Sequence, residues 1–384
     1  MYFKSDFLFL IHMTQSPDKQ PISYQDQLDK IAMKGFSGSQ VIMIVGIGQE
    51  LGIFDYLLKK SKNRPLSTTP SFVSFSLNEL QDQLSLNPVY LEAWLQMAVE
   101  CGIFEIDDVS HQTLRTAPYV FEMLVNRDDY LDKYVGFVIA AFYQLTSLQP
   151  FILQAFKTGA LLQKSEESVE KRMMLQKNSA RMGARVELVF STRCKEYKKV
   201  LQGGGTLLEV GCGFGYNLET WARKYPKAHF VGIDIDAEAT KLLQERVLAN
   251  NWGERIEIVH ASTKDYTQGA AKTFDVILLS HVLHELDPDE DYRKSVLLDI
   301  YALLKDDGVF IIADPLPTKI FTSQDTRPGQ QWANFLRAFA QWNEVAYGAR
   351  FYDKEGFQKL VASTPFKHVE LLQETEHAIW VIKK

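Results

Sequence analysis

One stretch in the second half of the chain constrains the fold more than any other. The apolar run Leu207–Leu208 ends at Glu209, and three glycines then occupy alternate positions, namely Gly211, Gly213 and Gly215. A helical pattern begins directly after them, and a second apolar run ends at Asp234. Glycine allows a tight turn and leaves backbone N–H groups open to a ligand. A strand, a glycine-rich turn and a helix in this order predict the first unit of a parallel α/β fold.

Strand and helix patterns alternate from Thr206 to the end of the chain. Apolar runs predict strands at 207–210, 230–233, 256–259, 276–279, 309–312 and 378–382. Helical patterns lie at 217–224, 237–250 and 291–304. Such units predict a doubly wound parallel sheet that binds its ligand at the carboxyl ends of the strands. These ends carry polar side chains that should converge on one cleft: Glu209, Asp234, Ser262, Ser280 to His284 and Asp314.

Composition narrows the cellular setting. The 384 residues allow two domains, and the hydrophobic share of 46% is ordinary for a globular protein. A net charge of −6 argues against nucleic acid as the main partner. Three widely spaced cysteines fit a reducing cytosol better than a disulfide framework or a zinc site. The apolar stretch at 7–11 is a poor signal peptide and far too short for a membrane span. We therefore expect a cytoplasmic protein with no membrane partner.

The first half of the chain predicts a separate helical domain. Residues 24–60 read as two helices joined near Gly35–Gly38, and the second carries an apolar face from Val41 to Ile53. That face must meet the rest of the fold or a second subunit, so we expect a homodimer.

A winged-helix pattern follows. Ser76–Glu79 is a capping box, Asn87–Pro88 opens the next helix, and a wing starts near Ile103. No Lys or Arg lies between Arg64 and Arg115, which disfavours DNA binding through this module.

These patterns divide the chain into four predicted parts. They are a flexible extension at 1–23, a helical and winged-helix dimerisation domain at 24–127, a helical bridge at 128–202 and the α/β domain at 203–384. A polar helix is expected through about 167–198. Aromatic side chains at near-helical spacing interrupt the α/β domain at 321–350; they either pack or roof a pocket for a planar or apolar acceptor, and they are Trp332, Phe335, Phe339, Trp342 and Tyr347.

The spacing of the glycines separates two classes of ligand. Dinucleotide sites use G-x-G-x-x-G to hold a pyrophosphate, whereas no further glycine follows Gly215 here. The chain resembles motif I of the class I S-adenosylmethionine (SAM)-dependent methyltransferases, whose ligand has a methionine tail and no phosphate. The resemblance implies that Glu209 lies near the methionine end and that Asp234 accepts the ribose hydroxyls. The glycines, Ser262 and Ser280 complete the predicted SAM site.

The stretch from His281 to Asp287 carries the candidate chemistry. A histidine after the fourth strand suits proton transfer, because its ordinary pKa lies near physiological pH. A winged helix, a SAM domain and a Leu-His-acidic motif resemble the plant-type and bacterial small-molecule O-methyltransferases, including the hydroxyindole enzymes. The resemblance implies that His284 is the general base. It also implies that Glu285 and Asp314 orient the base or border the substrate.

Three departures from the family pattern leave alternatives open. Leu286 replaces the family tryptophan, Ser262 replaces an acidic residue that meets the adenine, and Arg350 lies near the place of a late family glutamate. We predict no resident metal, but His281 and His284 form an H-x-x-H pair that suits metal-assisted C-methylation if a carboxylate joins them. A non-enzymatic SAM-binding regulator, with its winged helix for a partner or DNA, is the other alternative.

Overall fold

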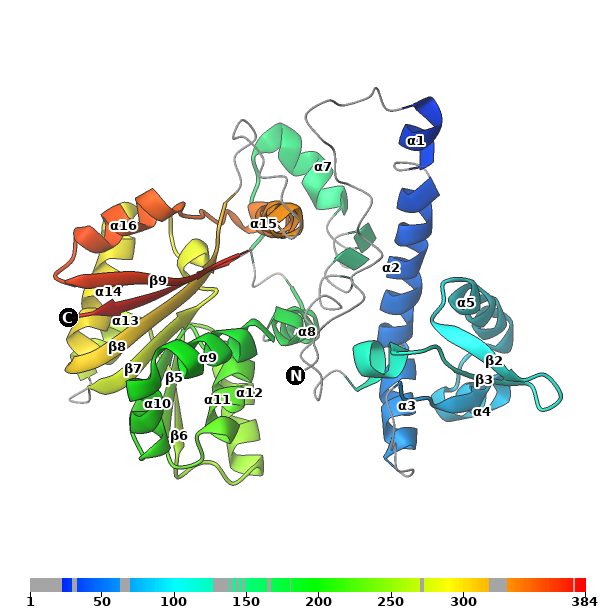
Figure 1. Cartoon of the computed structure of the whole chain (residues 1–384), viewed down its shortest axis with the longest axis horizontal. Coiled ribbons are helices and arrows are strands. Elements are labelled where there is room, and N and C mark those ends of the chain that lie inside the picture. Colours follow the sequence, from blue (N-terminus) through cyan, green and yellow to red (C-terminus); the bar gives the residue numbers. More distant parts are fainter. Residues whose placement is uncertain are drawn as a thin grey trace. The chain divides into compact units, whose positions relative to one another are not determined.

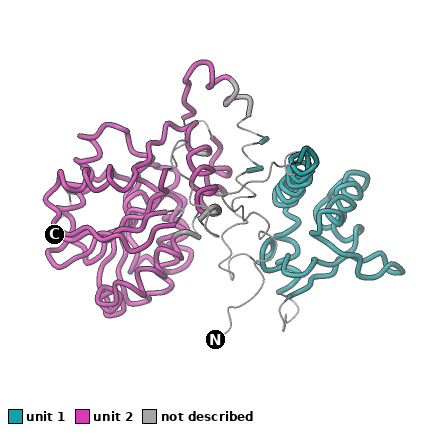
Figure 2. Tube along the Cα trace, turned by 45° about the horizontal axis from the view of Figure 1, so that its top comes forward, with its two compact units in different colours: residues 1–148 teal, residues 149–384 magenta. Residues whose placement is uncertain are grey.

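The computed structural model describes residues 23–29, 33–62, 70–126, 138, 141–142, 145–146, 149–163, 167–179, 181–269, 273–317, 330–375 and 377–384. The chain forms two compact units, residues 1–148 and 149–384 (Figure 2). Apart from Ser23, the predicted extension at 1–23 lies outside the described residues, and so does the start of the predicted aromatic segment, 321–329.

Unit 1 is built around a winged helix (Figure 1). Its elements are α1 (Tyr24–Leu28), α2 (Lys34–Glu50), α3 (Ile53–Ser61), β1 (Ser74–Ser76), α4 (Leu77–Leu84), α5 (Pro88–Glu100), β2 (Phe104–Asp108), β3 (Thr113–Thr116) and the π-helical turn η2 (Phe121–Val125). The strands pair antiparallel in the order β1-β3-β2. Ser76 and Glu79 form the predicted capping box, and the Asn87 side chain accepts from two N–H groups of α5. The predicted winged-helix pattern is therefore present.

The expected helix boundary near Gly35–Gly38 is wrong. α2 continues through both glycines, and the chain bends by 65° between α2 and α3 instead. Glycine weakens a helix by about 1 kcal/mol without stopping it, whereas Gly52 takes a left-handed φ of 71° that ends the helix. The predicted apolar face is largely covered within unit 1 itself, since Ile44, Val45 and Ile53 are buried in its core. Among the described residues no single helix is long and apolar enough to span a membrane, although α2 and α3 together reach that length and composition.

Unit 2 begins with four helices, α7 (Gln149–Thr158), α8 (Val169–Ser179), α9 (Arg181–Arg193) and α10 (Lys195–Gln202). Three of them, α8 to α10, replace the single polar helix expected at about 167–198, and Cys194 leaves the helical conformation between α9 and α10. The α/β part then contains β4 (Thr206–Val210), α11 (Tyr216–Lys224), β5 (His229–Asp234), α12 (Ala237–Ala249), β6 (Ile256–His260), α13 (Thr263–Gly269), β7 (Phe274–Ser280), η5 (Leu283–Glu285), α14 (Glu290–Leu303), β8 (Leu304–Pro315), α15 (Gln330–Glu344), η6 (Val345–Tyr347), α16 (Lys354–Ala362), β9 (His368–Glu374) and β10 (His377–Lys383).

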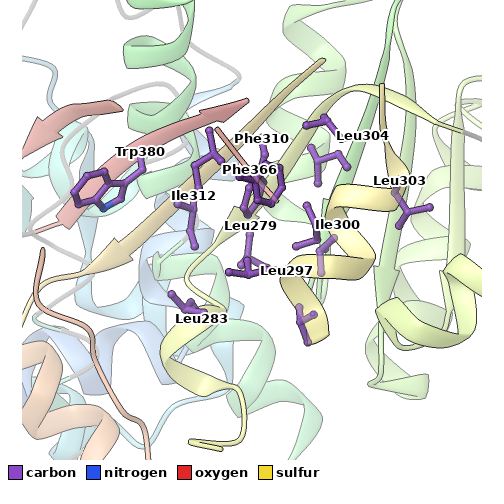
Figure 3. Close-up of a cluster of buried hydrophobic side chains, with 14 of the residues drawn as sticks. Leu279, Leu283, Leu297, Ile300, Leu303, Leu304, Phe310, Ile312, Phe366 and Trp380 are labelled. Atoms are coloured by element: carbon purple, nitrogen blue, oxygen red, sulfur yellow. The ribbon is translucent and has the colours of Figure 1, made fainter. Parts of the chain in front are cut away.

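One seven-stranded sheet organises unit 2. Its order is β6-β5-β4-β7-β8-β10-β9, with β10 antiparallel to both neighbours and the remaining pairs parallel. One face packs against α14 and α16 through a cluster that includes Leu297, Phe310 and Trp380 (Figure 3). The other face packs against α9 to α12 around Trp221. Each predicted strand is present, and the parallel strands end on the side that holds the candidate site.

Candidate active site

The glycine-rich turn after β4 is left-handed at all three predicted glycines. Gly211, Gly213 and Gly215 have φ of 71°, 48° and 76°, which side chains rarely adopt. Space is also restricted, because a Cβ at Gly211 would lie 2.5 Å from a methyl group of Val282. A Cβ at Gly213 would collide with the side chain of Gln176, and one at Gly215 with Leu243. The chain itself therefore requires glycine here, before any ligand is considered.

Asp234, at the end of β5, is fixed against this turn. One carboxylate oxygen accepts from Gly213 N at 2.6 Å and the other from Asp236 N at 2.8 Å. Burial raises the pKa of Asp234, and these two hydrogen bonds oppose the rise. The carboxylate is thus held in one orientation at the carboxyl edge of the sheet, as the predicted ribose contact requires.

Glu209, near the end of β4, is a buried carboxylate with one oxygen that lacks a hydrogen-bond donor in the described structure. It is only 2% exposed, and among the described residues no hydrogen-bond partner reaches its Oε2. Burial raises its pKa to about 8; a hydrogen bond from Asn217 opposes this effect, and the charge of Asp234 adds to it. A buried acceptor without a donor is unfavourable, so this position suits a ligand that brings a cation or an N–H group.

The two predicted serines lie in different settings. The Ser262 hydroxyl donates to Asp265 at 2.6 Å and accepts from the backbone N–H of Asp265 at 3.1 Å. Asp265, at the start of α13, thus brings a carboxylate next to Ser262. Ser280 ends β7 and is buried, and its hydroxyl has no hydrogen-bond partner within the described part of the chain.

His284 and Asp314 form a buried pair between the ends of β7 and β8. His284 Nδ1 lies 2.9 Å from Asp314 Oδ1, and the imidazole is 3% exposed. The carboxylate accepts a hydrogen bond from Nδ1–H, which leaves Nε2 as the nitrogen that can exchange a proton with an acceptor. Phe351 stacks on the imidazole at 4.9 Å with an interplanar angle of 9°, and the backbone N–H of Arg350 donates to the His284 carbonyl at 2.9 Å. The ring orientation, the tautomer and the backbone of His284 are therefore all fixed by neighbouring groups.

Three carboxylates surround this imidazole. Burial alone would lower the pKa of His284, but the charge and hydrogen bond of Asp314, with the charges of Glu285 and Glu344, raise it to about 9. Glu344 was not expected from the sequence. It lies at the end of α15, and its carboxylate shares a cluster with His284 and Glu285 in which all ligand atoms lie within 4.8 Å of one another. Sixty positions separate Glu344 from the motif, so no local pattern could have found it.

Arg293 is a second residue that the sequence did not reveal. It lies on α14 and is only 2% exposed. The guanidinium donates to three carbonyl oxygens, those of Leu286, Asp287 and Arg350, at 2.9 to 3.0 Å. It thereby joins the segment after His284 to the backbone that donates to the same histidine. Arginine suits this role because its fork offers several donors in a fixed plane.

His281 takes a different place from His284. It has a left-handed φ of 59°, and its ring stacks on the buried His377 at 4.6 Å. The His281 and His284 ring centres lie 6.3 Å apart. Within the described residues, the group of His, Cys, Asp or Glu close enough to hold an ion is His284, Glu285 and Glu344, and His281 is not part of it. An H-x-x-H site is thus not formed in this arrangement.

Helix α15 has an aromatic side and a polar side. Phe335 and Phe339 stack at 6.4 Å, Trp342 lies 6.1 Å from Phe156 of α7, and Phe335 and Trp342 are about half exposed. Arg337 instead donates to the carbonyl of Thr375 at 2.6 Å. The side chain of Trp332 lies outside the described residues, and the Tyr347 hydroxyl donates to Glu167 at 2.8 Å. The helix therefore keeps exposed aromatic surface beside a polar anchor.

The comparisons with known proteins agree with this geometry. The family profile described as "Methyltransferase domain" matches residues 208–310. Human N-acetylserotonin methyltransferase, solved in complex with SAM, has a TM-score of 0.61 at 13% identity, with 96% of this chain and 99% of that chain covered. PigF with SAH has a TM-score of 0.61 at 16% identity, with 95% and 100% covered. The chain therefore contains a methyltransferase domain, and it shares its fold with these solved structures over nearly its whole length. The predicted fold class and family resemblance are confirmed.

Curated relatives match a shorter part of the chain. Erythromycin 3''-O-methyltransferase of Saccharopolyspora erythraea is 31% identical over 115 residues, which are 30% of this chain and 36% of that protein. A ribosomal protein L11 methyltransferase of Desulforamulus reducens is 28% identical over 122 residues, 32% of this chain and 36% of that protein. The chain thus spans little more than a third of the length of these relatives.

Proposed function

We propose that this protein transfers a methyl group from SAM to an oxygen atom of a small molecule, with His284 as general base. The His284–Asp314 pair carries the proposal, since it lies at the strand ends next to a SAM-type glycine-rich turn. The relatives and solved structures named above support SAM as cofactor. The aromatic side of α15 supports a planar or apolar acceptor, and a homodimer in the cytoplasm stays a prediction from the sequence.

The residues fit SAM in two respects. The Glu209 Oε2 lacks a donor, which the amino group of the methionine tail would supply. Asp234 is oriented to accept from the ribose hydroxyls. When bound, SAM supplies an activated methyl group on a sulfonium sulfur.

His284 then serves the acceptor. Its Nε2 would accept the proton of the acceptor hydroxyl while Asp314 holds the Nδ1 proton and stabilises the imidazolium that forms. Because the pKa of His284 is raised to about 9, the imidazole is largely protonated at neutral pH, so methyl transfer should speed up as the pH rises toward 9 and frees Nε2. Glu285 borders the same space and stays a candidate for orienting the base or the acceptor.

Replacing the base tests this proposal. His284→Ala should lower kcat by about 10²–10⁴-fold, the usual range for losing a general base, while SAM affinity measured by calorimetry is retained. His368→Ala is the matched control, because this exposed histidine begins the edge strand β9 and pairs with Lys383 at the other end of the sheet from the site. Near-normal turnover of His284→Ala would overturn the base assignment.

Metal-assisted transfer is the second candidate, and the cluster of His284, Glu285 and Glu344 favours it. One nitrogen and two carboxylates suit a divalent transition ion, and Asp314 on the far nitrogen resembles the outer support that metal-bound histidines have. Activity lost to EDTA and restored by a divalent ion would select this candidate. Unchanged activity in EDTA would retain the base. A regulator, by contrast, would bind SAM and release no S-adenosylhomocysteine (SAH).

A further inference from the structure

Helix α8 contacts the glycine-rich turn from a distant part of the sequence. The Gln176 side-chain oxygen accepts from the backbone N–H of Phe214 at 2.6 Å. Its amide also fills the space next to Gly213 that a Cβ would need. The guanidinium of Arg172 lies 5.8 Å from the centre of the Phe214 ring. Since residues 172 and 176 are one helical turn apart, a single face of α8 covers the turn.

Arg172 also holds the acidic residues that follow Asp234. Its guanidinium forms ion pairs with Asp236 and, at 2.8 Å, with Glu238. Asp236 in turn caps α12 and donates its backbone N–H to Asp234. The arginine side chain is 14% exposed, so its charge is partly shielded from solvent. Arg172 thereby offsets two carboxylates beside the one that we propose for the ribose.

The described contacts that join α8 to the glycine-rich turn and to the start of α12 are polar. Every residue of α8 whose burial is described, 169–173 and 175–176, keeps some exposure, and none is fully buried. A second polar link lies before the helix, where Glu167 pairs with Lys171 at 2.7 Å and accepts from the Tyr347 hydroxyl. The contacts of the described residues of α8 are therefore polar, and a segment held by such contacts can separate from its partner at modest cost.

We infer that α8 forms a wall of the cofactor pocket, with Arg172 and Gln176 as positioning residues that hold the glycine-rich turn and Asp234 in the geometry that binds SAM. This inference rests on the proposed function. A separate observation points to a ligand at this wall: Arg172 Nε is buried, and among the described residues it has no hydrogen-bond partner. A buried donor on the pocket wall suits an oxygen-rich ligand, such as the ribose or the carboxylate of SAM.

Calorimetric titration with SAM and SAH tests the inference on the intact protein. Arg172→Gln and Gln176→Ala should each weaken binding by about tenfold, which is roughly 1.4 kcal/mol. Arg172→Lys should restore little, because an ammonium group cannot reproduce the planar fork between two carboxylates. The affinity of the wild type should fall as salt is added, and less so in Arg172→Gln, since ion pairs with exposed partners are screened.

Arg193→Gln is the matched control. Arg193 pairs with Glu370 at 3.7 Å with both side chains more than half exposed, away from the turn. Equal thermal midpoints in Arg172→Gln and Arg193→Gln, with affinity lost only in the former, would support a positioning role. Equal affinity in these two variants would overturn it, and so would an affinity loss that merely follows a lowered midpoint.

A double replacement tests the contact directly. Gly213→Ala should lose less affinity in a Gln176→Ala background than in the wild type, because the collision partner has been removed. Additive losses would contradict the contact between α8 and the turn. If the wild type binds neither SAM nor SAH, the proposed function itself fails; if it binds and the α8 variants bind equally well, only the present inference fails.

Discussion

Replacement of Glu209 by glutamine should stabilise the free protein and weaken its hold on SAM. Glutamine keeps the shape of the buried side chain and removes the charge for which Oε2 has no donor in the described structure. Burial raises the pKa of Glu209 from 4.5 to about 8. Ionisation of this carboxylate therefore costs more in the folded than in the unfolded chain, and it lowers the free energy of unfolding. The stability that the folded chain gains from keeping Glu209 protonated is fully present below about pH 4.5 and is lost as the pH rises through 8.

The size of the effect follows from the same pKa. Ionising Glu209 in the folded chain costs at most about 5 kcal/mol relative to the unfolded chain, and less after local relaxation. Glu209→Gln should therefore match the wild type near pH 4.5 and exceed it at pH 8.5. A gain of about 2 kcal/mol would raise the melting temperature by roughly 4–8 °C in a unit of this size. Thermal unfolding across this pH range, without ligand, is the measurement.

Glu187→Gln is the control, because Glu187 is equally buried but satisfied. Its oxygens accept from the Tyr225 hydroxyl and from Lys224 Nζ, both at 2.6 Å. This variant should lose about 1–3 kcal/mol, since a hydrogen-bonded charge is removed. The reasoning is refuted if Glu209→Gln is less stable than the wild type at pH 8.5, or if it binds SAM with unchanged affinity.

Three further outcomes are expected. Asp314→Asn should lower the pKa of His284 from about 9, so the pH–rate profile of methyl transfer should rise at a lower pH than in the wild type. Arg293→Met should leave three carbonyl oxygens without their donor and lower the free energy of unfolding in urea by about 2–4 kcal/mol. Asp234→Ala should weaken SAM binding by about 1.5–3 kcal/mol in calorimetry, the range for a hydrogen bond to a charged group; unchanged affinity would remove Asp234 from the proposed site.

The homodimer also remains a prediction, although its first argument has weakened. The apolar face of α2 was expected to need a second subunit, yet Ile44 and Val45 are buried by the core of unit 1. Light scattering on the intact chain at micromolar concentration should give twice the chain mass. A monomer under these conditions would contradict the prediction.

Local sequence patterns predicted the elements whose side chains alternate strongly between core and surface. β4, β5 and β7 have buried apolar runs bounded by polar residues, so their positions could be found without a structure. β9 was missed because it is an edge strand whose residues are only partly buried. The junction predicted near Gly35–Gly38 was wrong and the bend at Gly52 was missed, because these glycines look alike in sequence and differ only in backbone conformation.

The sequence by itself determined that a glycine-rich turn, Asp234, His284 and Asp314 would meet, because the carboxyl ends of parallel strands lie on one edge of the sheet. Only the tertiary structure decided which other groups join them. Glu344, Arg293 and Gln176 come from helices whose spacing to the motifs carries no pattern. Strand ends are placed by the regular geometry of a sheet, whereas long-range side-chain contacts depend on how each helix packs. That packing raises the pKa of His284, leaves one oxygen of Glu209 without a described donor, and places α8 against the glycine-rich turn.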